Sequence, residues 1–396
     1  MIGWKKTFIS SFLAQVLSML GFSFALPFLP FFIGELGISK QDDQALWAGI
    51  ILGATGVTLA IFAPLWGVMA DRYGRKKMVI RSMFGGTLVL ILMSFSRNIF
   101  DLLICRLIQG ALTGTVSASI ALVASVTPIR RSGFALGMMQ AAAFVGVAVG
   151  PLVGGLIADA YSYRVAFRIG ALIILSGGLM VQFGAIESVQ TTEEKQEKMP
   201  SLLQLLKASG VFAAILILLS VRFANTIINP SFPLVIADII HNPERLNSIT
   251  GMIMAFGGTS GAIAAGLFGY IGDKIGHRKI VILCSFGAAV TATAHAFAQS
   301  IAALTVANLF FAMTTSGILP AVNAMIQGST DQKHIGKAFG LAASISMIGL
   351  AIGPLSGGYL AKEINIRAPF IAAGICQLLV TGLAWRSSVS LKRTHI

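Results

Sequence analysis

The chain has 396 residues, of which 56% are hydrophobic and only 11% are charged. Its mean hydropathy is +0.84. Water-soluble proteins carry roughly a quarter of their residues as charged side chains, so this composition excludes a soluble globular protein. The net charge of +14 would suit nucleic-acid binding, but the placement of Lys and Arg favours a membrane protein, with no nucleic acid as partner.

Twelve apolar runs follow one another, most of them as long as the roughly 20 residues that a helix needs to cross a bilayer. The runs lack the alternation of barrel strands, so helices are the structure that lipid permits. We predict helices at residues 8–33, 45–69, 78–96, 99–126, 133–158, 165–187, 209–237, 247–271, 279–297, 301–326, 335–360 and 367–386. The first run is too long for the core of a signal peptide, so we expect it to be retained as a transmembrane helix.

One connector stands apart by composition. Residues 188–208 contain the polar, charge-mixed run from Gln190 to Pro200, which is typical of a linker. It separates six predicted helices in residues 1–187 from six in residues 209–396. The sequence therefore predicts an all-α membrane protein of twelve transmembrane helices in two six-helix bundles, joined by a cytoplasmic linker.

The two halves are copies of each other at an offset of 202 or 203 residues. Pro27 and Pro30 recur as Pro230 and Pro233, and the run from Gly146 to Gly155 recurs at 349–358. The turn residues Gly67, Asp71, Gly74 and Lys77 recur as Gly269, Asp273, Gly276 and Lys279. Because each copy holds six helices, both have the same orientation in the membrane. Parallel repeats of this kind are typical of transporters whose substrate site lies between the halves.

The basic residues indicate the orientation of the chain. With the N-terminus inside, twenty of the 29 Lys and Arg residues fall on the inner side and seven on the outer side, while Arg106 and Arg222 lie within helices. Positive residues favour the cytoplasmic side. We therefore expect both termini in the cytoplasm and the protein in a bacterial inner membrane, surrounded by lipid.

Three motifs resemble those of the major facilitator superfamily, and the resemblance covers essentially the whole chain. The turn Gly67-x-x-x-Asp71-Arg72-x-Gly74-Arg75-Lys76-Lys77 resembles the family's signature between helices 2 and 3. Arg106-x-x-Gln109-Gly110 resembles the helix-4 motif of drug exporters, and Gly146-x-x-x-Gly150-Pro151-x-x-Gly154-Gly155 resembles the helix-5 motif of antiporters. Together they resemble the twelve-helix drug:proton antiporters of bacteria, including multidrug exporters.

The resemblance implies that the first motif and its copy in the second half form a cytoplasmic gate made of Gly67, Asp71, Arg75 and Asp273. Asp71 would interact with Arg75 and with the start of helix 11 to hold an outward-facing state. From the residues alone, a carboxylate is favoured at a helix N-terminus, and Gly67 permits close packing. The alternative is a turn that only sets topology through its positive charges.

Small residues form one smooth face on helix 5 and again on helix 11. Gly146, Gly150 and Gly154 recur every four residues, beside a proline that permits bending, Pro151. Gly353 and Pro354 repeat this arrangement in the second half. We expect bending and packing of helix 5 against helix 8 or a similar helix; the alternative is tight packing alone.

Polar stripes inside two predicted helices mark the candidate substrate site. Arg106, Gln109 and Thr113 share one face of helix 4 and Arg222, Asn225 and Asn229 share one face of helix 7, while Asn308 is equivalent to Arg106 by the internal repeat. Buried Arg is costly in a membrane and normally faces a cavity or a partner. We predict that both stripes line a central cavity, the alternative being structural residues that backbone groups satisfy.

None of the fifteen carboxylates lies at the middle of a predicted helix. Proton coupling through Asp71 or Asp101 is therefore a hypothesis, based on the raised pKa of buried carboxyl groups. Two buried cations without a buried anion favour anionic or zwitterionic substrates over lipophilic cations. We interpret His295 as a packed or interfacial residue.

The leading interpretation is a monomeric secondary transporter that exports small amphipathic compounds by proton antiport, with the proton gradient as energy source and no cofactor or metal. A second is an exporter or importer of one endogenous organic anion, such as a polycarboxylate metallophore. A third is a transport-inactive membrane receptor or scaffold. An enzyme is not expected, because no nucleophile–base pair or metal cluster is apparent, and the three cysteines Cys105, Cys284 and Cys376 lie in apolar runs.

Overall fold

The computed structural model describes residues 2–187, 209–240, 245–328 and 335–386; the predicted linker at 188–208 lies outside this part. The first half consists of α1 (Ile2–Ser23), the 3₁₀ turn η1 (Leu26–Phe28), α2 (Leu29–Glu35), α3 (Gln41–Tyr73), α4 (Arg75–Ser94), α5 (Ile99–Leu112), α6 (Thr115–Val126), α7 (Ile129–Ala160) and α8 (Tyr163–Gly184). The second half consists of α10 (Ser209–Ile227), α11 (Phe232–Ile239), α12 (Leu246–Ile275), α13 (His277–Phe297), α14 (Ile301–Gly328), α15 (Ile335–Glu363) and α16 (Ala368–Arg386).

These helices form twelve segments that are long and apolar enough to cross a membrane, six before residue 188 and six after residue 208. The described residues contain no strand. The prediction of an all-α protein with twelve membrane-spanning helices is confirmed.

Three of the twelve segments are interrupted where the backbone cannot continue as an α-helix. Proline lacks an N–H group and clashes with the preceding turn, and Pro27 and Pro30 separate α1 from α2 through η1. The copies of these prolines lie where α10 gives way to α11. The fourth segment, expected to be continuous over 99–126, instead breaks at Gly114, whose φ of 112° is open mainly to glycine.

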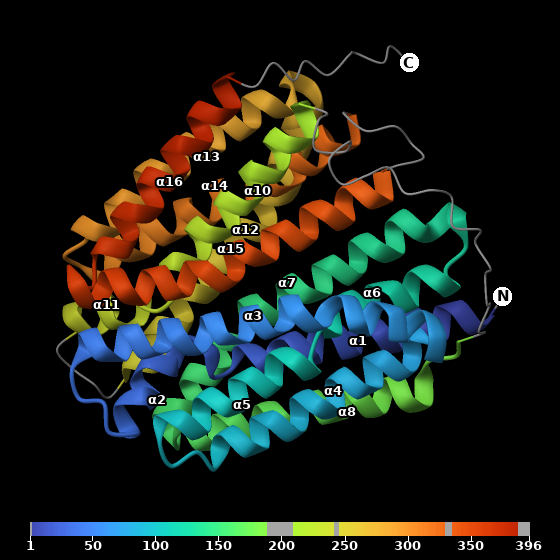
Figure 1. Ribbon diagram of the computed structural model, residues 1–396, viewed down its shortest axis with the longest axis horizontal. Helices are drawn as coiled ribbons and strands as arrows, with labels where there is room; N and C mark the ends of the chain where they lie inside the picture. The colour runs from blue at the N-terminus through green and yellow to red at the C-terminus, as the bar shows by residue number, and fades with distance from the viewer. Residues whose placement is uncertain (1, 188–208, 241–244, 329–334, 387–396) are drawn as a thin grey trace.

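The helices form two bundles that are closest together at the end where α2 and α11 lie (Figure 1). The bundles diverge toward the opposite end, where α1 begins and α16 ends (Figure 1). That opposite end carries the α3–α4 turn with Arg75, Lys76 and Lys77, so we call it the basic end and the other the distal end. Along the seams between the bundles, α3 packs on α15 and α7 packs on α12.

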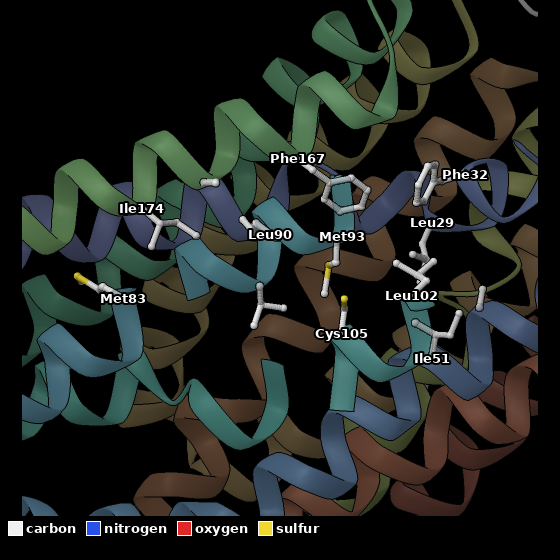
Figure 2. Close-up of a cluster of buried hydrophobic side chains, with 14 of the residues drawn as sticks. Leu29, Phe32, Ile51, Met83, Leu90, Met93, Leu102, Cys105, Phe167 and Ile174 are labelled. Carbon is white, nitrogen blue, oxygen red and sulfur yellow. The ribbon is translucent and has the colours of Figure 1, made fainter. Parts of the chain in front are cut away.

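Each bundle has its own apolar core. In the first, side chains of α1 to α6 and α8 meet in one cluster, which includes Leu29, Phe32, Met93, Leu102 and Phe167 (Figure 2). The rings of Phe32 and Phe167 pack edge to face with centroids 5.3 Å apart. The large cores of the two bundles are separate, and a small cluster of Ala45, Leu234 and Ala361 joins the bundles at the distal end.

Candidate functional site

A cavity of about 440 Å³ lies between the two bundles. From the first bundle it is lined by α1, η1, α3 and α7, and from the second by α10, α11, α12, α14 and the turn between α10 and α11. Its walls are mostly apolar, with the aromatic rings of Phe144, Phe232 and Phe311 among them. Its polar lining side chains are uncharged: Ser23, Asn225, Asn229, Asn308, Thr315 and Ser316. Its volume and lining are those of a small-molecule site.

Three of the residues predicted to bind substrate line this cavity, namely Asn225, Asn229 and Asn308. Asn308 donates through Nδ2 to the carbonyl of Ile253 on α12, at 3.0 Å. The Oδ1 atom of Asn225 is buried and has no hydrogen-bond partner among the described residues. A buried acceptor without a donor is costly, and this one belongs to a residue of the cavity lining. Pro151, predicted as a bending point, also lines the cavity.

Arg222 does not line the cavity but lies close to its edge. It precedes Asn225 by three residues, so the two side chains share one face of α10. Since α10 runs from the basic end toward the distal end, Arg222 lies nearer the basic end than Asn225 does. Its side chain is exposed. Arg222 is therefore a cation about one helical turn from Asn225, on the side of the basic end.

Arg106, Gln109 and Thr113 lie away from the cavity, which differs from the prediction that this stripe lines it. Arg106 is only 2% exposed, and its guanidinium donates to Oε1 of Gln109 at 2.9 Å. The hydroxyl of Thr113 donates to the carbonyl of Gln109 at 2.7 Å. The helix α5 packs against α3 and α4 of the same bundle, so this stripe is internal to the first bundle.

The predicted small-residue faces join helices within each bundle. A Cβ atom added to Gly146, Gly150 or Gly154 would lie 2.1 to 2.5 Å from atoms of α1 or of Phe24, the residue after it. A Cβ added to Gly353 would likewise lie 2.1 Å from Oγ1 of Thr226 on α10. Pro151 and Pro354 lie instead on the seams between bundles. Their carbonyl oxygens are 2.2 and 2.3 Å from the Cβ positions of Gly251 on α12 and Gly49 on α3.

At the distal end, polar contacts hold the two bundles together, both between α7 and α12 and between α3 and α15. The carboxylate of Asp159 on α7 accepts hydrogen bonds from the backbone N–H and the side chain of both Asn247 and Ser248, at 2.5 to 3.2 Å. It therefore caps the first turn of α12 in the other bundle. On the other seam, Nζ of Lys362 lies 3.2 Å from Asp43 at the start of α3.

Toward the basic end the seams are open. Gly56 on α3 still lies against Ala351, where an added Cβ would be 2.8 Å from the Cα of that residue. A Cβ added to Gly67, nearly two turns before the end of α3, would meet nothing within 4 Å. On the other seam, a Cβ added to Gly258 would lie 2.9 Å from the Cβ of Ala148, whereas one added to Gly137 or Gly266 would meet nothing within 4 Å. The cavity is thus closed at the distal end, and the helices beside it separate toward the basic end.

The predicted gate residues make contacts only within their own bundles in the described part of the chain. Asp71 lies in the last turn of α3, 3.7 Å from Arg75, and its side chain is 76% exposed. Asp273 occupies the same place in α12, 3.2 Å from His277 and 74% exposed. Between the partners lie Gly74 and Gly276, both with φ of 98°, a value that side chains rarely permit.

The carboxylate at the N-terminus of α4 belongs to Glu187, so the placement of Asp71 there was wrong. The carboxylate oxygens of Glu187 accept from the backbone N–H groups of Arg75 and Lys76, each at 2.8 Å. The helix α3 continues to Tyr73, which places Asp71 at a helix C-terminus instead. Asp101 caps its own turn at the distal end, accepting from the N–H of Arg97 at 2.9 Å. Neither Asp71 nor Asp101 lines the cavity.

Sequence reasoning missed the distal contacts of Asp159 and the aromatic lining of the cavity. Asp159 reads as an outer-loop carboxylate, and its partners lie 88 and 89 residues further along the chain. Only the internal repeat offered a signal, because Asp159 and Lys362 stand at equivalent places in the two halves.

A family model described as "Major Facilitator Superfamily" matches residues 11–223 and again residues 214–393. The chain is 30% identical, over its whole length and 97% of the relative, to multidrug resistance protein MdtG of Escherichia coli O17:K52:H18. The same protein of Escherichia coli O1:K1 is also 30% identical, with the same coverage.

Solved structures share the fold at lower sequence identity. A bacterial homolog of the human lysosomal transporter Spinster, described as inward-facing and occupied, has a TM-score of 0.81 at 12% identity, with 96% of each chain covered. The human organic anion transporter MFSD10 has a TM-score of 0.71 at 17% identity, covering 97% of this chain and all of the other.

Proposed function

Because the chain belongs to the major facilitator superfamily, we propose that it is a secondary active transporter that exports small amphipathic compounds in exchange for protons. Its twelve apolar helices make it a multi-pass protein of the bacterial inner membrane. The relatives that match its whole length are named as multidrug resistance proteins, which supports efflux of foreign compounds. Its substrate is a small molecule, bound while the protein is surrounded by lipid.

The observation that carries this proposal is the cavity between the bundles. Uncharged amides and aromatic rings line it, and Oδ1 of Asn225 lacks a donor. Such a lining suits compounds of varied shape that combine an apolar body with a few polar groups. The separate large cores of the two bundles support rocking of one bundle against the other around this site.

We place the basic end in the cytoplasm, because positive residues favour that side. Both termini would then be cytoplasmic, and the cavity would open inward. Closing the basic end would bring Gly67 and the Asp71–Arg75 turn against the second bundle, while the distal contacts of Asp159 and Lys362 would separate. Alternating between these arrangements would release the compound outside. Each chain holds a complete cavity, so we expect the monomer to be the working unit.

For the substrate we propose amphipathic anions and zwitterions. Arg222 is a cation at the cytoplasmic side of the cavity, and the cavity lining has no carboxylate to attract a cation. A guanidinium pairs well with carboxylate, phosphonate or sulfonate groups. A single exposed Arg beside an uncharged lining is less suited to a polycarboxylate metallophore, which would need several donors.

Competition between two matched probes tests the substrate class. Naphthalenesulfonate and N-methylquinolinium are both permanently charged bicyclic aromatics, of opposite sign. We expect purified protein to bind the sulfonate at least about tenfold more tightly, with the preference lost in Arg222→Gln. Equal affinity for the two probes would contradict the proposed preference for anions. Failure of reconstituted protein to move either probe would favour a receptor or scaffold instead.

A further inference from the structure

The imidazole of His295 lies directly behind the wall of the cavity, where it takes no part in lining the substrate site. It is the third residue from the distal end of α13 and is 0% exposed. Two aromatic residues that line the cavity also contact its ring, Phe311 at 5.6 Å and Phe232 at 6.0 Å between centroids. On its other side the ring stacks on Phe370, with an interplanar angle of 8°.

Hydrogen bonding fixes which nitrogen of this ring can accept a proton. Nδ1 lies 2.7 Å from the carbonyl oxygen of Thr291, and because a carbonyl only accepts, Nδ1 carries the hydrogen. In the neutral ring Nε2 then holds a free lone pair. Nε2 is buried and makes no hydrogen bond of normal geometry among the described residues. The side chain of Asn308, which lines the cavity, faces the same ring closely enough for a weak hydrogen bond.

The ionisable residues that the sequence marks as candidates are poorly suited to exchanging protons at the cavity. Arg106 and Arg222 do not lose their protons in proteins, and Asp71 and Asp101 lie at the ends of their helices. Histidine is the side chain whose ordinary pKa, about 6.5, falls in the physiological range. We propose that His295 is the proton carrier of this transporter, an inference that rests on the proposed proton exchange.

Charged groups near the ring gather at its distal side. Arg367, just before α16, donates to the carbonyl of Ala296 at 3.2 Å and pairs with Asp238 of α11 at 3.1 Å. The helix α14 carries no charged residue. On α10, α12, α13 and α16 the remaining charged or titratable groups lie farther from the ring, toward the basic end: Arg222, Tyr270, Asp273, Lys274, His277, Arg278, Lys279, Cys284, Cys376 and Arg386.

This arrangement gives the proton step a direction. In the inward-open structure an imidazolium would sit among aromatic rings without a counter-ion in contact, an environment that disfavours charge. We therefore expect the ring to be neutral here and to take up a proton from the distal solution when the distal seam opens. The N–H bond formed at Nε2 breaks when the cavity next opens inward, and the proton leaves to cavity water.

The test measures conformation against pH and needs no substrate. Spin labels at Gly137 and Gly266, which face open space on opposite bundles, report closure of the basic end in a chain whose three cysteines are replaced by alanine. Lowering the pH from about 8 to about 5 should increase the closed population in the wild type. In His295→Gln this response should vanish or its midpoint should move by about one pH unit or more. Ser285→Ala, a buried polar change elsewhere on α13, should behave as the wild type.

Two results would overturn the inference while leaving proton exchange standing. One is a His295→Gln variant whose closure of the basic end has the same pH midpoint as that of the wild type. The other, independent of any variant that misfolds, is a ¹⁵N spectrum in which the His295 ring of the wild type stays neutral throughout this pH range. If the wild type itself shows no pH response, and its naphthalenesulfonate flux ignores a pH gradient, the proposed proton exchange fails together with the inference.

Discussion

Asp159 and Lys362 stand 203 residues apart, the offset that relates the two halves, and each ties the distal end of its helix to a helix of the other bundle. Asp159 caps α12 through four hydrogen bonds, whereas Lys362 makes one ion pair with Asp43. Equivalent positions thus close the two seams by different chemistry. The difference decides how strongly each contact should hold the distal end closed.

Removing the carboxylate of Asp159 should favour opening of the distal end. Hydrogen bonds to a charged group contribute roughly 1.5–3 kcal/mol each, and about 1.4 kcal/mol corresponds to a tenfold change in population. We expect Asp159→Ala to raise the outward-open population at least about tenfold, measured with the Gly137–Gly266 label pair. Glu363→Ala, an exposed carboxylate at the end of α15, is the control. Equal distance distributions in both variants would argue against the cap.

The Lys362–Asp43 pair should matter less. Its side chains are 41% and 37% exposed, and exposed ion pairs contribute about 0–1 kcal/mol. We expect Lys362→Gln to shift the same populations by less than about fivefold, and the exchanged pair Lys362→Asp with Asp43→Lys to restore them. A larger effect than that of Asp159→Ala would make the ion pair, and not the helix cap, the main distal contact.

Two glycines should respond differently to the same added methyl group. A Cβ at Gly357 would lie 1.9 Å from the carbonyl oxygen of Ile227, so Gly357→Ala should destabilise the fold by roughly 1–3 kcal/mol. Gly67 faces open space in this state, so Gly67→Ala should leave the thermal unfolding midpoint nearly unchanged. It should nevertheless slow naphthalenesulfonate flux, if the basic end closes onto Gly67. Unimpaired flux would remove Gly67 from the gate.

Substitutions of Arg106 and Asn225 should distinguish a residue that stabilises the fold from one that binds substrate. Arg106→Met leaves Oε1 of Gln109 buried without its donor, which costs roughly 1–3 kcal/mol of stability. The affinity of the folded variant for naphthalenesulfonate should stay within about twofold of the wild type. Asn225→Leu should keep the stability and lower the affinity about tenfold, measured by equilibrium binding. The opposite pattern would return Arg106 to the substrate site.

The fold was largely predictable because lipid leaves the backbone few choices and the internal repeat supplied the parallel arrangement of halves. The candidate site was predictable in part. Helical periodicity placed Asn225 and Asn229 on one face, and the cavity lies along that face. The same periodicity could not show that the Arg106 face turns inward within its own bundle, because that depends on how α5 packs against α3 and α4.

Tertiary structure also determines the contacts of Asp159 and His295. Nothing in the sequence pairs Asp159 with the start of α12, and nothing places Phe232, Phe311 and Phe370 around His295. A lone histidine in an apolar run is usually a packed residue, and the neighbours of its ring become apparent only when α11, α13, α14 and α16 come together.

The central claim, proton-driven export through the cavity between the bundles, is tested most directly by flux from right-side-out proteoliposomes loaded with radiolabelled naphthalenesulfonate. The probe is permanently charged, so a pH gradient cannot drive it across the lipid by itself. Efflux should accelerate when the outside is acidified, should slow in Asn225→Leu, and should be absent from protein-free vesicles. Equal efflux with and without the gradient, or an unchanged rate in Asn225→Leu, would contradict proton-driven export through this cavity.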